Sequence, residues 1–250
     1  MNLKEVLVSA KLNGDKQAWL TAYDYPTSRL LDEAGIDLLL VGDSLGMVVL
    51  GYPDTVDVTM EEMLHHLRAV RRGALRVPVA ADLPYGSYHT TDQALTNARR
   101  MIDAGAHAVK LEGCLPQQIK TITAEGIEVI GHLGMLPQHV REEGGYHKKG
   151  KTEAEAQSLL ASALTLQESG CCALVLELVD APVAGIITEK LDIPTIGIGS
   201  GAACDGQILV TPDLLGLQPW FRPAFVKAKA DLVSPFRQAI ADYIREVRDE

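Results

Sequence analysis

The chain has 250 residues, a formal net charge of −10 and 22% charged residues, which is typical of a soluble globular protein. The acidic balance disfavours nucleic acid and anionic membranes as partners, because phosphate contacts need clustered Lys and Arg. No apolar run approaches bilayer-spanning length and the first residues lack a signal-peptide pattern, so we expect a cytoplasmic protein. The four cysteines form no C-x-x-C pair and are expected to be packed, reduced thiols.

Short aliphatic runs alternate with longer amphipathic segments along the whole chain. We expect strands at 18–22, 38–41, 77–81, 108–111, 129–131, 173–176 and 195–198, and an eighth at 207–210. Helices are expected at 26–34, 59–72, 91–104, 116–124, 152–169 and 183–190, with a C-terminal helix at 226–247. The gap before the eighth strand is too short for an ordinary helix.

This repeat of strand and helix predicts an α/β protein. No linker or change in composition divides the chain, so we expect one domain over residues 1–250. An open doubly wound sheet and a (β/α)₈ TIM barrel both fit the pattern. Seven or eight units over this length favour the barrel.

Ionisable residues follow many of the expected strands. They are Asp24, Asp43, Asp82, Lys110 with Glu112, His132, and Glu177. The C-terminal ends of barrel strands meet at one mouth, where the active sites of this fold lie. A solvated strand end or a helix cap is the alternative for any single residue. Carboxylates crowded at one mouth would repel each other unless a cation or shared protons offset their charge.

The candidate ligands at this mouth are oxygens, which favours Mg²⁺ or Mn²⁺ over zinc. Asp43 and Asp82 are the expected direct ligands, and Glu112 is expected to act through bound water. Lys110 and Ser44 would hold a negatively charged substrate. A 2-oxo acid fits, because its carboxylate and ketone oxygens chelate a metal, and the metal then stabilises an adjacent enolate.

Two further residues at the mouth are candidates for proton transfer. Glu177, which follows an apolar run on another strand, is the expected general base. His132 is an additional candidate, either as a hydrogen-bond donor or relay at the mouth or as a structural histidine bonded to backbone. The glycine-rich segment 197–201 is expected to allow close backbone packing near a ligand, because no proper helix follows it to bind a dinucleotide.

The chain resembles the ketopantoate hydroxymethyltransferase family in an ordered set of segments that covers about residues 21–216. In chain order these are Thr21-Ala22-Tyr23-Asp24-Tyr25, Val41-Gly42-Asp43-Ser44-Leu45-Gly46-Met47, Gly51-Tyr52, Ala69-Val70-Arg71-Arg72-Gly73, Ala81-Asp82-Leu83-Pro84, Val109-Lys110-Leu111-Glu112-Gly113, Gly131-His132-Leu133-Gly134 with Pro137-Gln138, Gly144-Gly145-Tyr146, Leu176-Glu177, Ile193-Pro194-Thr195-Ile196-Gly197-Ile198-Gly199 and Asp205-Gly206-Gln207.

The resemblance implies a (β/α)₈ barrel of the phosphoenolpyruvate mutase/isocitrate lyase type. It also implies transfer of a hydroxymethyl group from 5,10-methylenetetrahydrofolate to 3-methyl-2-oxobutanoate, giving 2-dehydropantoate in pantothenate synthesis, by a homodecamer. The implied Mg²⁺ site comprises Asp43 and Asp82 with Glu112 in its shell. The implied oxo acid site comprises Asp43, Ser44, Asp82 and Lys110, and Glu177 would accept the proton.

The chain departs from the family pattern at 85–89, where Tyr-Gly-Ser-Tyr-His replaces a more apolar stretch. Two other functions stay open at this point. A barrel lyase or mutase would use the same Mg²⁺ and oxo acid without folate, although its usual Lys-Lys-Cys-Gly loop is missing from this sequence. A non-catalytic barrel is the second alternative, and the acidic set at the strand ends argues against it.

Overall fold

The computed structural model describes residues 2–220 and 223–249. Its internal packing divides the chain into two compact units, Met1–Ile208 and Leu209–Glu250, which are described separately below. The single domain expected from the sequence stays a prediction.

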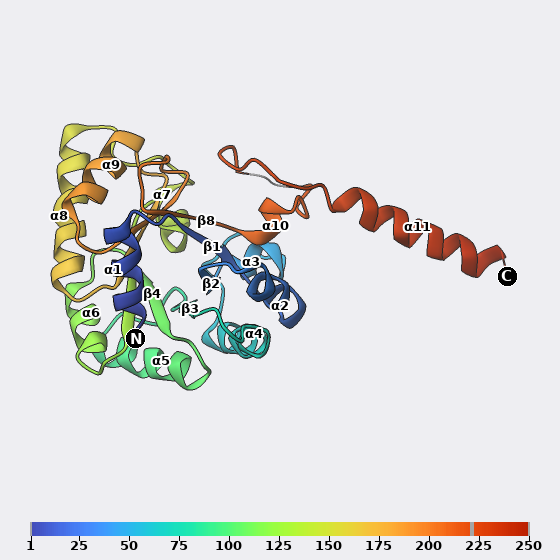
Figure 1. Ribbon diagram of the computed structural model, residues 1–250, viewed down its shortest axis with the longest axis horizontal. Helices are drawn as coiled ribbons and strands as arrows, with labels where there is room; N and C mark the ends of the chain where they lie inside the picture. The colour runs from blue at the N-terminus through green and yellow to red at the C-terminus, as the bar shows by residue number, and fades with distance from the viewer. Residues whose placement is uncertain (1, 221–222, 250) are drawn as a thin grey trace. The chain divides into compact units, whose positions relative to one another are not determined.

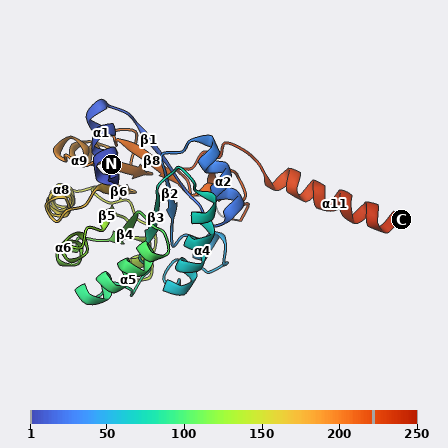
Figure 2. The same ribbon diagram turned by 60° about the horizontal axis from the view of Figure 1, so that its bottom comes forward.

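The centre of the first unit is a closed barrel of parallel strands that follow one another in chain order (Figures 1 and 2). The strands are β1 (Gln17–Thr21), β2 (Leu38–Val41), β3 (Val79–Asp82), β4 (Ala108–Glu112), β5 (Glu128–Gly134), β6 (Ala173–Glu177), β7 (Thr195–Ile198) and β8 (Gly206–Leu209). All of the expected strands are present, including the irregular eighth. The predicted (β/α)₈ architecture is confirmed.

Helices surround the strand ring (Figure 2). They are α2 (Tyr25–Ala34), α4 (Met60–Gly73), α5 (Thr91–Asp103), α6 (Pro116–Thr123), α8 (Glu153–Glu168) and α9 (Ala181–Lys190). Their starts follow local chemistry: Thr59 and Glu62 form a capping box at α4, and Thr152 accepts the N–H of Glu155 at α8. Shorter helices α3 (Leu45–Val48), η1 (Pro137–His139) and α7 (Val140–Glu143) lie in loops that follow strands.

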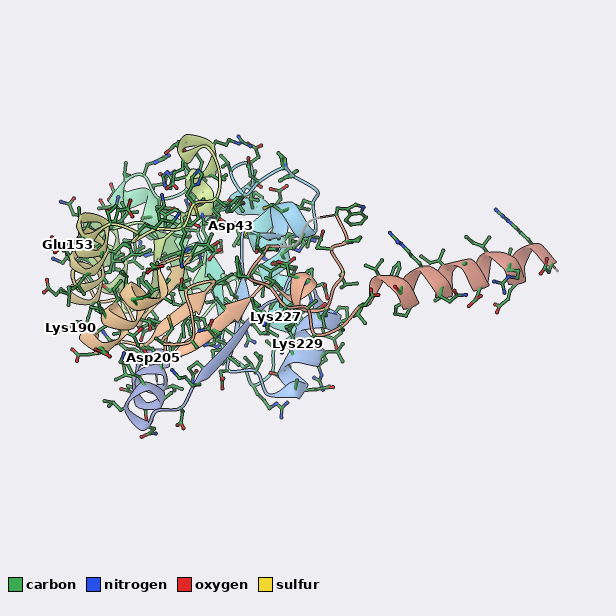
Figure 3. The ribbon with its side chains drawn as sticks, turned by 90° about the horizontal axis from the view of Figure 1, so that it is seen from above. Asp43, Glu153, Lys190, Asp205, Lys227 and Lys229 are labelled. Carbon is green, nitrogen blue, oxygen red and sulfur yellow. The ribbon has the colours of Figure 1, made fainter. Side chains whose placement is uncertain are left out.

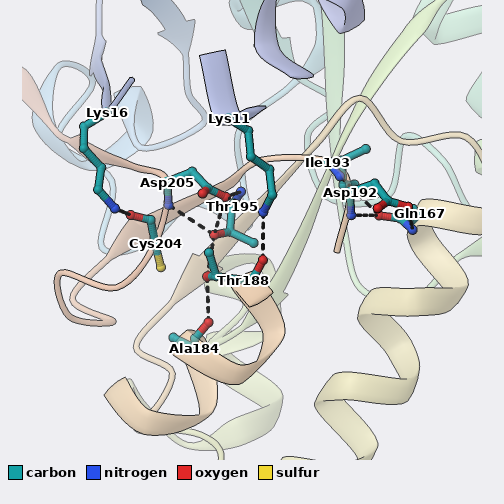
Figure 4. Close-up of polar contacts among 10 residues, drawn as sticks. All are labelled: Lys11, Lys16, Gln167, Ala184, Thr188, Asp192, Ile193, Thr195, Cys204 and Asp205. Atoms are coloured by element: carbon teal, nitrogen blue, oxygen red, sulfur yellow. Dashed lines mark hydrogen bonds and ion pairs between the residues drawn. The ribbon is translucent and has the colours of Figure 1, made fainter. Parts of the chain in front are cut away.

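One helix of the first unit, α1 (Leu3–Asn13), was not expected. Asn2 and Glu5 form its capping box, and Gly14 ends it in a left-handed conformation. Leu7 packs with the side chains inside the barrel, and the Lys11 ammonium binds Asp205 Oδ2 at 2.8 Å and the Thr188 carbonyl at 2.7 Å (Figure 4). Asp205 also accepts the N–H of Thr195, so α1 is fastened to the N-terminal ends of β7 and β8.

The side chains of each strand alternate between two apolar layers. Leu38 and Leu40 belong to the cluster inside the barrel, whereas Leu39 and Val41 pack outward against the helices. Strands buried on both faces need apolar residues at every position, which explains the continuous aliphatic runs in the sequence. The low aromatic content is sufficient because Leu, Val, Ile and Ala fill both layers.

The second unit contains α10 (Thr211–Leu214) and α11 (Val233–Asp249). The expectation of a helix from 226 was wrong at its start. The amides of Lys229 and Leu232 donate to the carbonyls of Leu214 and Leu215 instead of forming a helical ladder. Asp231 then accepts the Ser234 amide, at the point where α11 begins.

Three cysteines, Cys171, Cys172 and Cys204, are buried, whereas Cys114 is exposed, and none forms a disulfide. Burial raises the pKa of the Cys171 thiol to about 12, and it also raises the pKa of Cys172 and Cys204. A protonated thiol is a poor nucleophile, so these three side chains act as packing residues.

Candidate active site

The C-terminal ends of neighbouring strands bring the predicted residues into contact. In the strand register Asp82 pairs with Lys110, Glu112 pairs with His132, and Gly134 pairs with Glu177. Asp43 follows β2 at the same end of the barrel, opposite the end that carries Asp205 (Figure 3). The site is therefore assembled by the barrel itself, one strand at a time.

Two cations and several carboxylates form a connected network at this mouth. The Lys110 Nζ lies 3.0 Å from Asp82 Oδ1. His132 lies between two acids, with Nδ1 3.5 Å from Glu112 Oε1 and Nε2 3.3 Å from Glu177 Oε2. Of these side chains only Glu177 has appreciable exposure, at 13%. Buried charges at such distances interact strongly.

The contacts within this network shift the pKa values of His132 and Glu112. Burial and the Lys110 charge lower the pKa of His132, but Glu112 and Glu177 outweigh them and raise it to about 9. Burial raises the pKa of Glu112, but its contacts with His132 and Lys110 outweigh burial and lower it. Lys110 Nζ also lies 3.3 Å from His132 Nδ1, within hydrogen-bond distance.

The pKa values of Asp43 and Asp82 are raised, in contrast to that of Glu112. The Asp43 amide donates to Asp82 Oδ2 at 3.1 Å, so the two residues are direct neighbours. Burial raises the pKa of Asp43, and the charges of Asp82 and Glu112 raise it further. Burial also raises the pKa of Asp82 despite its pairing with Lys110. The positive charge of Lys110 lowers the pKa of both aspartates, but it does not outweigh their burial.

These features fit a divalent cation. Within the described residues, Asp82 Oδ1 and Glu112 Oε1 are buried, and each faces one cationic side chain, Lys110 Nζ at 3.0 Å and His132 Nδ1 at 3.5 Å. Carboxylate oxygens are the ligands that Mg²⁺ prefers, and an ion of charge +2 would offset the excess negative charge. Residues 2–220 and 223–249 contain no ready-made group of three His, Cys, Asp or Glu ligands. Water and substrate would therefore have to complete the coordination sphere.

The backbone around Glu177 is unusually constrained. Its carbonyl accepts the Met135 amide at 2.8 Å, and a Cβ atom on Gly134 would lie 2.1 Å from that carbonyl oxygen. The next residue, Leu178, has φ of 48° and is the one non-glycine residue of the described chain in the left-handed region. Strained backbone of this kind is stored at functional sites when the surrounding structure enforces it. The ends of β5 and β6 therefore hold Glu177 in a defined place.

The remaining predicted residues have clear positions. Ser44 is half-buried, and its hydroxyl lies 2.8 Å from the Tyr23 hydroxyl. Asp24 does not join the site, because its carboxylate caps α2 by accepting the Thr27 amide. The 197–201 segment packs closely, as expected: Ser200 Oγ accepts the Val179 amide and donates to the Leu176 carbonyl.

Loops that follow β2 and β5 meet beside the mouth. Arg141 binds the carboxylates of Asp54 and Asp57, with contacts from 2.5 to 3.1 Å. Lys148 and Lys149 pair with Asp180 and Glu143, so this basic segment is neutralised by its neighbours rather than presented to a ligand. Two residues that the sequence did not point to also lie here: Gln138, after β5, donates to Asp43, and Tyr88, in the loop after β3, donates to Gln138.

Solved structures with this fold define the class of the protein. The chain aligns over its full length with phosphonopyruvate hydrolase, crystallised with oxalate and Mg²⁺, at a TM-score of 0.66, 12% identity and 88% coverage of that chain. It aligns equally with 2,3-dimethylmalate lyase, a member of the PEP mutase/isocitrate lyase superfamily, at a TM-score of 0.63, 14% identity and 89% coverage. The molecule is thus a (β/α)₈ barrel protein, and this is the fold that it shares with these structures.

Sequence relatives resolve the family within this class. The family model for ketopantoate hydroxymethyltransferase matches residues 3–250. The 3-methyl-2-oxobutanoate hydroxymethyltransferase of Syntrophus aciditrophicus is 51% identical over 98% of this chain and 91% of its own length. The enzyme of the same name from Carboxydothermus hydrogenoformans is 51% identical over 100% of this chain and 90% of its own. The chain belongs to the ketopantoate hydroxymethyltransferase family and is an enzyme.

Proposed function

We propose that this enzyme transfers a hydroxymethyl group from 5,10-methylenetetrahydrofolate to 3-methyl-2-oxobutanoate, giving 2-dehydropantoate for pantothenate synthesis. The observation that carries the proposal is the convergence of Asp43, Asp82 and Glu112 with Lys110, His132 and Glu177 at one barrel mouth. The names of the sequence relatives support the acceptor substrate.

The proposed cofactor is Mg²⁺, with Asp43 and Asp82 as direct ligands and Glu112 in the surrounding shell. When bound, the ion would polarise the ketone and stabilise an adjacent enolate. Lys110 and Ser44 would hold the carboxylate of the oxo acid. The burial of the two aspartates, which raises the pKa of both although Lys110 lies beside them, and the oxygen-only donor set support this assignment.

Glu177 is the proposed base, removing the single proton on C3 of the oxo acid. The resulting enolate carbon bonds to the methylene carbon of the folate as one of its two carbon–nitrogen bonds breaks. Water then replaces the second nitrogen on this carbon, which gives the hydroxymethyl product and tetrahydrofolate. His132, whose Nε2 lies 3.3 Å from Glu177 Oε2, would hold the carboxylate in place, and the proton that Glu177 takes from C3 would pass to a nitrogen of the released folate. The constrained backbone at Gly134 and Leu178 supports a fixed position for this base.

Proton NMR of 3-methyl-2-oxobutanoate in D₂O tests the first half of this reaction. With Mg²⁺ and no folate, the wild-type enzyme should remove the C3 proton signal, and Glu177→Gln should not. If exchange occurs only after tetrahydrofolate is added, the base stands and folate must bind first. Absence of exchange under both conditions would exclude the enolate route for this substrate.

A lyase or mutase reaction on the same oxo acid chemistry is the second candidate, because the fold is shared with enzymes of that class. Folate dependence of product formation distinguishes the two. Turnover of 3-methyl-2-oxobutanoate that needs no one-carbon donor would favour the lyase.

We also infer a cytoplasmic homo-oligomer, a decamer by family resemblance. No helix in the described part of the chain is long and apolar enough to cross a membrane. Apolar side chains along α11 are exposed, at Phe236, Ile240, Tyr243, Ile244 and Val247. A contiguous apolar stripe of this kind supports a protein interface.

A further inference from the structure

The side chain of Gln138, which follows β5, forms hydrogen bonds with residues that follow β2 and β3 at the acidic site. It lies in η1, directly after β5, and is 2% exposed. Its Nε2 donates to Asp43 Oδ2 at 2.7 Å and to the Leu83 carbonyl at 3.0 Å. Its Oε1 accepts the hydroxyl of Tyr88, which is 7% exposed. Every polar atom of this buried amide therefore has a partner.

These contacts leave a single orientation for the amide. A carboxylate and a carbonyl accept hydrogen bonds and do not donate them, so the NH₂ group must face Asp43 and Leu83. The Tyr88 hydroxyl then supplies the proton that the amide oxygen needs. Rotating the amide by 180° would place its oxygen against two acceptors, Asp43 Oδ2 and the Leu83 carbonyl, and both hydrogen bonds would be lost.

Gln138 also contacts a second acid through its backbone. Its amide N–H donates to Glu112 Oε2 at 3.1 Å. One residue thus binds two of the proposed metal-site carboxylates, one through the side chain and one through the main chain. An aspartate carboxylate rotates freely about its terminal bond unless a partner holds it. Here the repulsion among neighbouring acids would otherwise turn Asp43 away from Asp82.

We propose that Gln138, held in place by Tyr88, is a positioning residue that fixes the carboxylates of Asp43 and Glu112 in the orientation that receives a divalent cation. This inference rests on the proposed function of the site. Groups that orient metal ligands in this way typically contribute 10–100-fold to metal affinity. The hydrogen bonds of the Gln138 amide would thus both stabilise the fold and orient the carboxylates of the site.

Mn²⁺ binding followed by electron paramagnetic resonance tests the inference on the full-length enzyme. The variants are Gln138→Met, which keeps the volume and removes the amide, and Tyr88→Phe, which removes one hydroxyl. Gln167→Met is the matched control. Gln167 makes three hydrogen bonds to Asp192 and Ile193, at the opposite end of the barrel (Figure 4). Thermal unfolding of each variant is measured alongside.

The Mn²⁺ dissociation constant should rise about 10–100-fold in Gln138→Met. In Tyr88→Phe it should rise about threefold to tenfold, the equivalent of one hydrogen bond. Gln167→Met should lose thermal stability without a change in Mn²⁺ affinity. Wild-type affinity in Gln138→Met would overturn the positioning role and leave the metal site intact. Failure of the wild-type enzyme to bind Mn²⁺, with or without the oxo acid, would overturn the proposed metal site and the inference together.

Discussion

At the scale of single residues, glycine at 134 is required by its neighbour on the next strand. Its φ of 100° disfavours other residues, and the carbonyl of Glu177 occupies the space that a side chain would need. Glu177, the proposed base, can therefore hold this position only because residue 134 on the neighbouring strand has no side chain.

The substitution Gly134→Ala should destabilise the enzyme by about 3 kcal/mol, because it combines left-handed strain with a direct clash. Gly113→Ala is the control: it has φ of 88°, but its nearest neighbour would be 3.8 Å away, and it should cost about 1 kcal/mol. Urea unfolding followed by circular dichroism measures both. If both variants lost the same free energy of unfolding, the ends of β5 and β6 would be able to move apart and relieve the clash.

The sequence pointed to most of the residues that meet at the mouth, because each follows an aliphatic run and barrel strands end together. For Asp24 it left a site residue and a helix cap open, because both follow a strand in the same local sequence, and the hydrogen bond from the Thr27 amide identifies the cap. Tyr88 and Gln138 were not selected, because their contacts join loops that follow different strands. Pairings of that kind leave no signal in local periodicity.

At the scale of elements, α2 is connected to the segment that leads into β3 through one buried carboxylate. Asp32 accepts the amides of Arg76 and Val77 at 2.8 and 2.9 Å and the guanidinium of Arg76 at 3.2 Å. Burial alone raises the pKa of Asp32, but these donors outweigh it and lower the pKa below the ordinary value of 3.8. The ionised form is thus the one that the fold stabilises.

The sign of this shift makes the contribution pH-dependent. Stability supplied by Asp32 is complete above its ordinary pKa and is lost as the pH falls through the lower pKa of the folded state. Asp32→Asn should therefore be about 2 kcal/mol less stable than the wild type at pH 7. The difference should shrink below about pH 4. Urea midpoints at pH 7, 5 and 3.5 measure it, and a difference that grows on acidification would contradict the assignment.

Element existence was easier to predict than element boundaries. Buried parallel strands are visible in the sequence as aliphatic runs, and the first and last residues of β2 and β7 were predicted correctly. The helix α1 was missed although Asn2 and Glu5 carry its capping signal. Its position across the N-terminal end of the barrel depends on long-range bonds from Lys11, which no local pattern encodes.

At the scale of the whole molecule, α11 has no buried residue, yet one side of it is apolar. An isolated helix of this length is marginal in water, so its apolar side is expected to be covered in an assembly. The double substitution Phe236→Ser with Tyr243→Ser should reduce the oligomer size measured by sedimentation velocity. Arg237→Ser, on the same helix, should leave it unchanged. An unaltered oligomer in the double variant would exclude α11 from the interface.

The uneven burial of the cysteines has a practical consequence. Cys171, Cys172 and Cys204 are enclosed and protonated, whereas Cys114 is exposed two residues beyond Glu112. A maleimide dye applied to the native enzyme would therefore attach at one position, at the rim of the barrel mouth, without any mutation. The natural chain thus carries its own attachment point for a fluorescent reporter of ligand arrival.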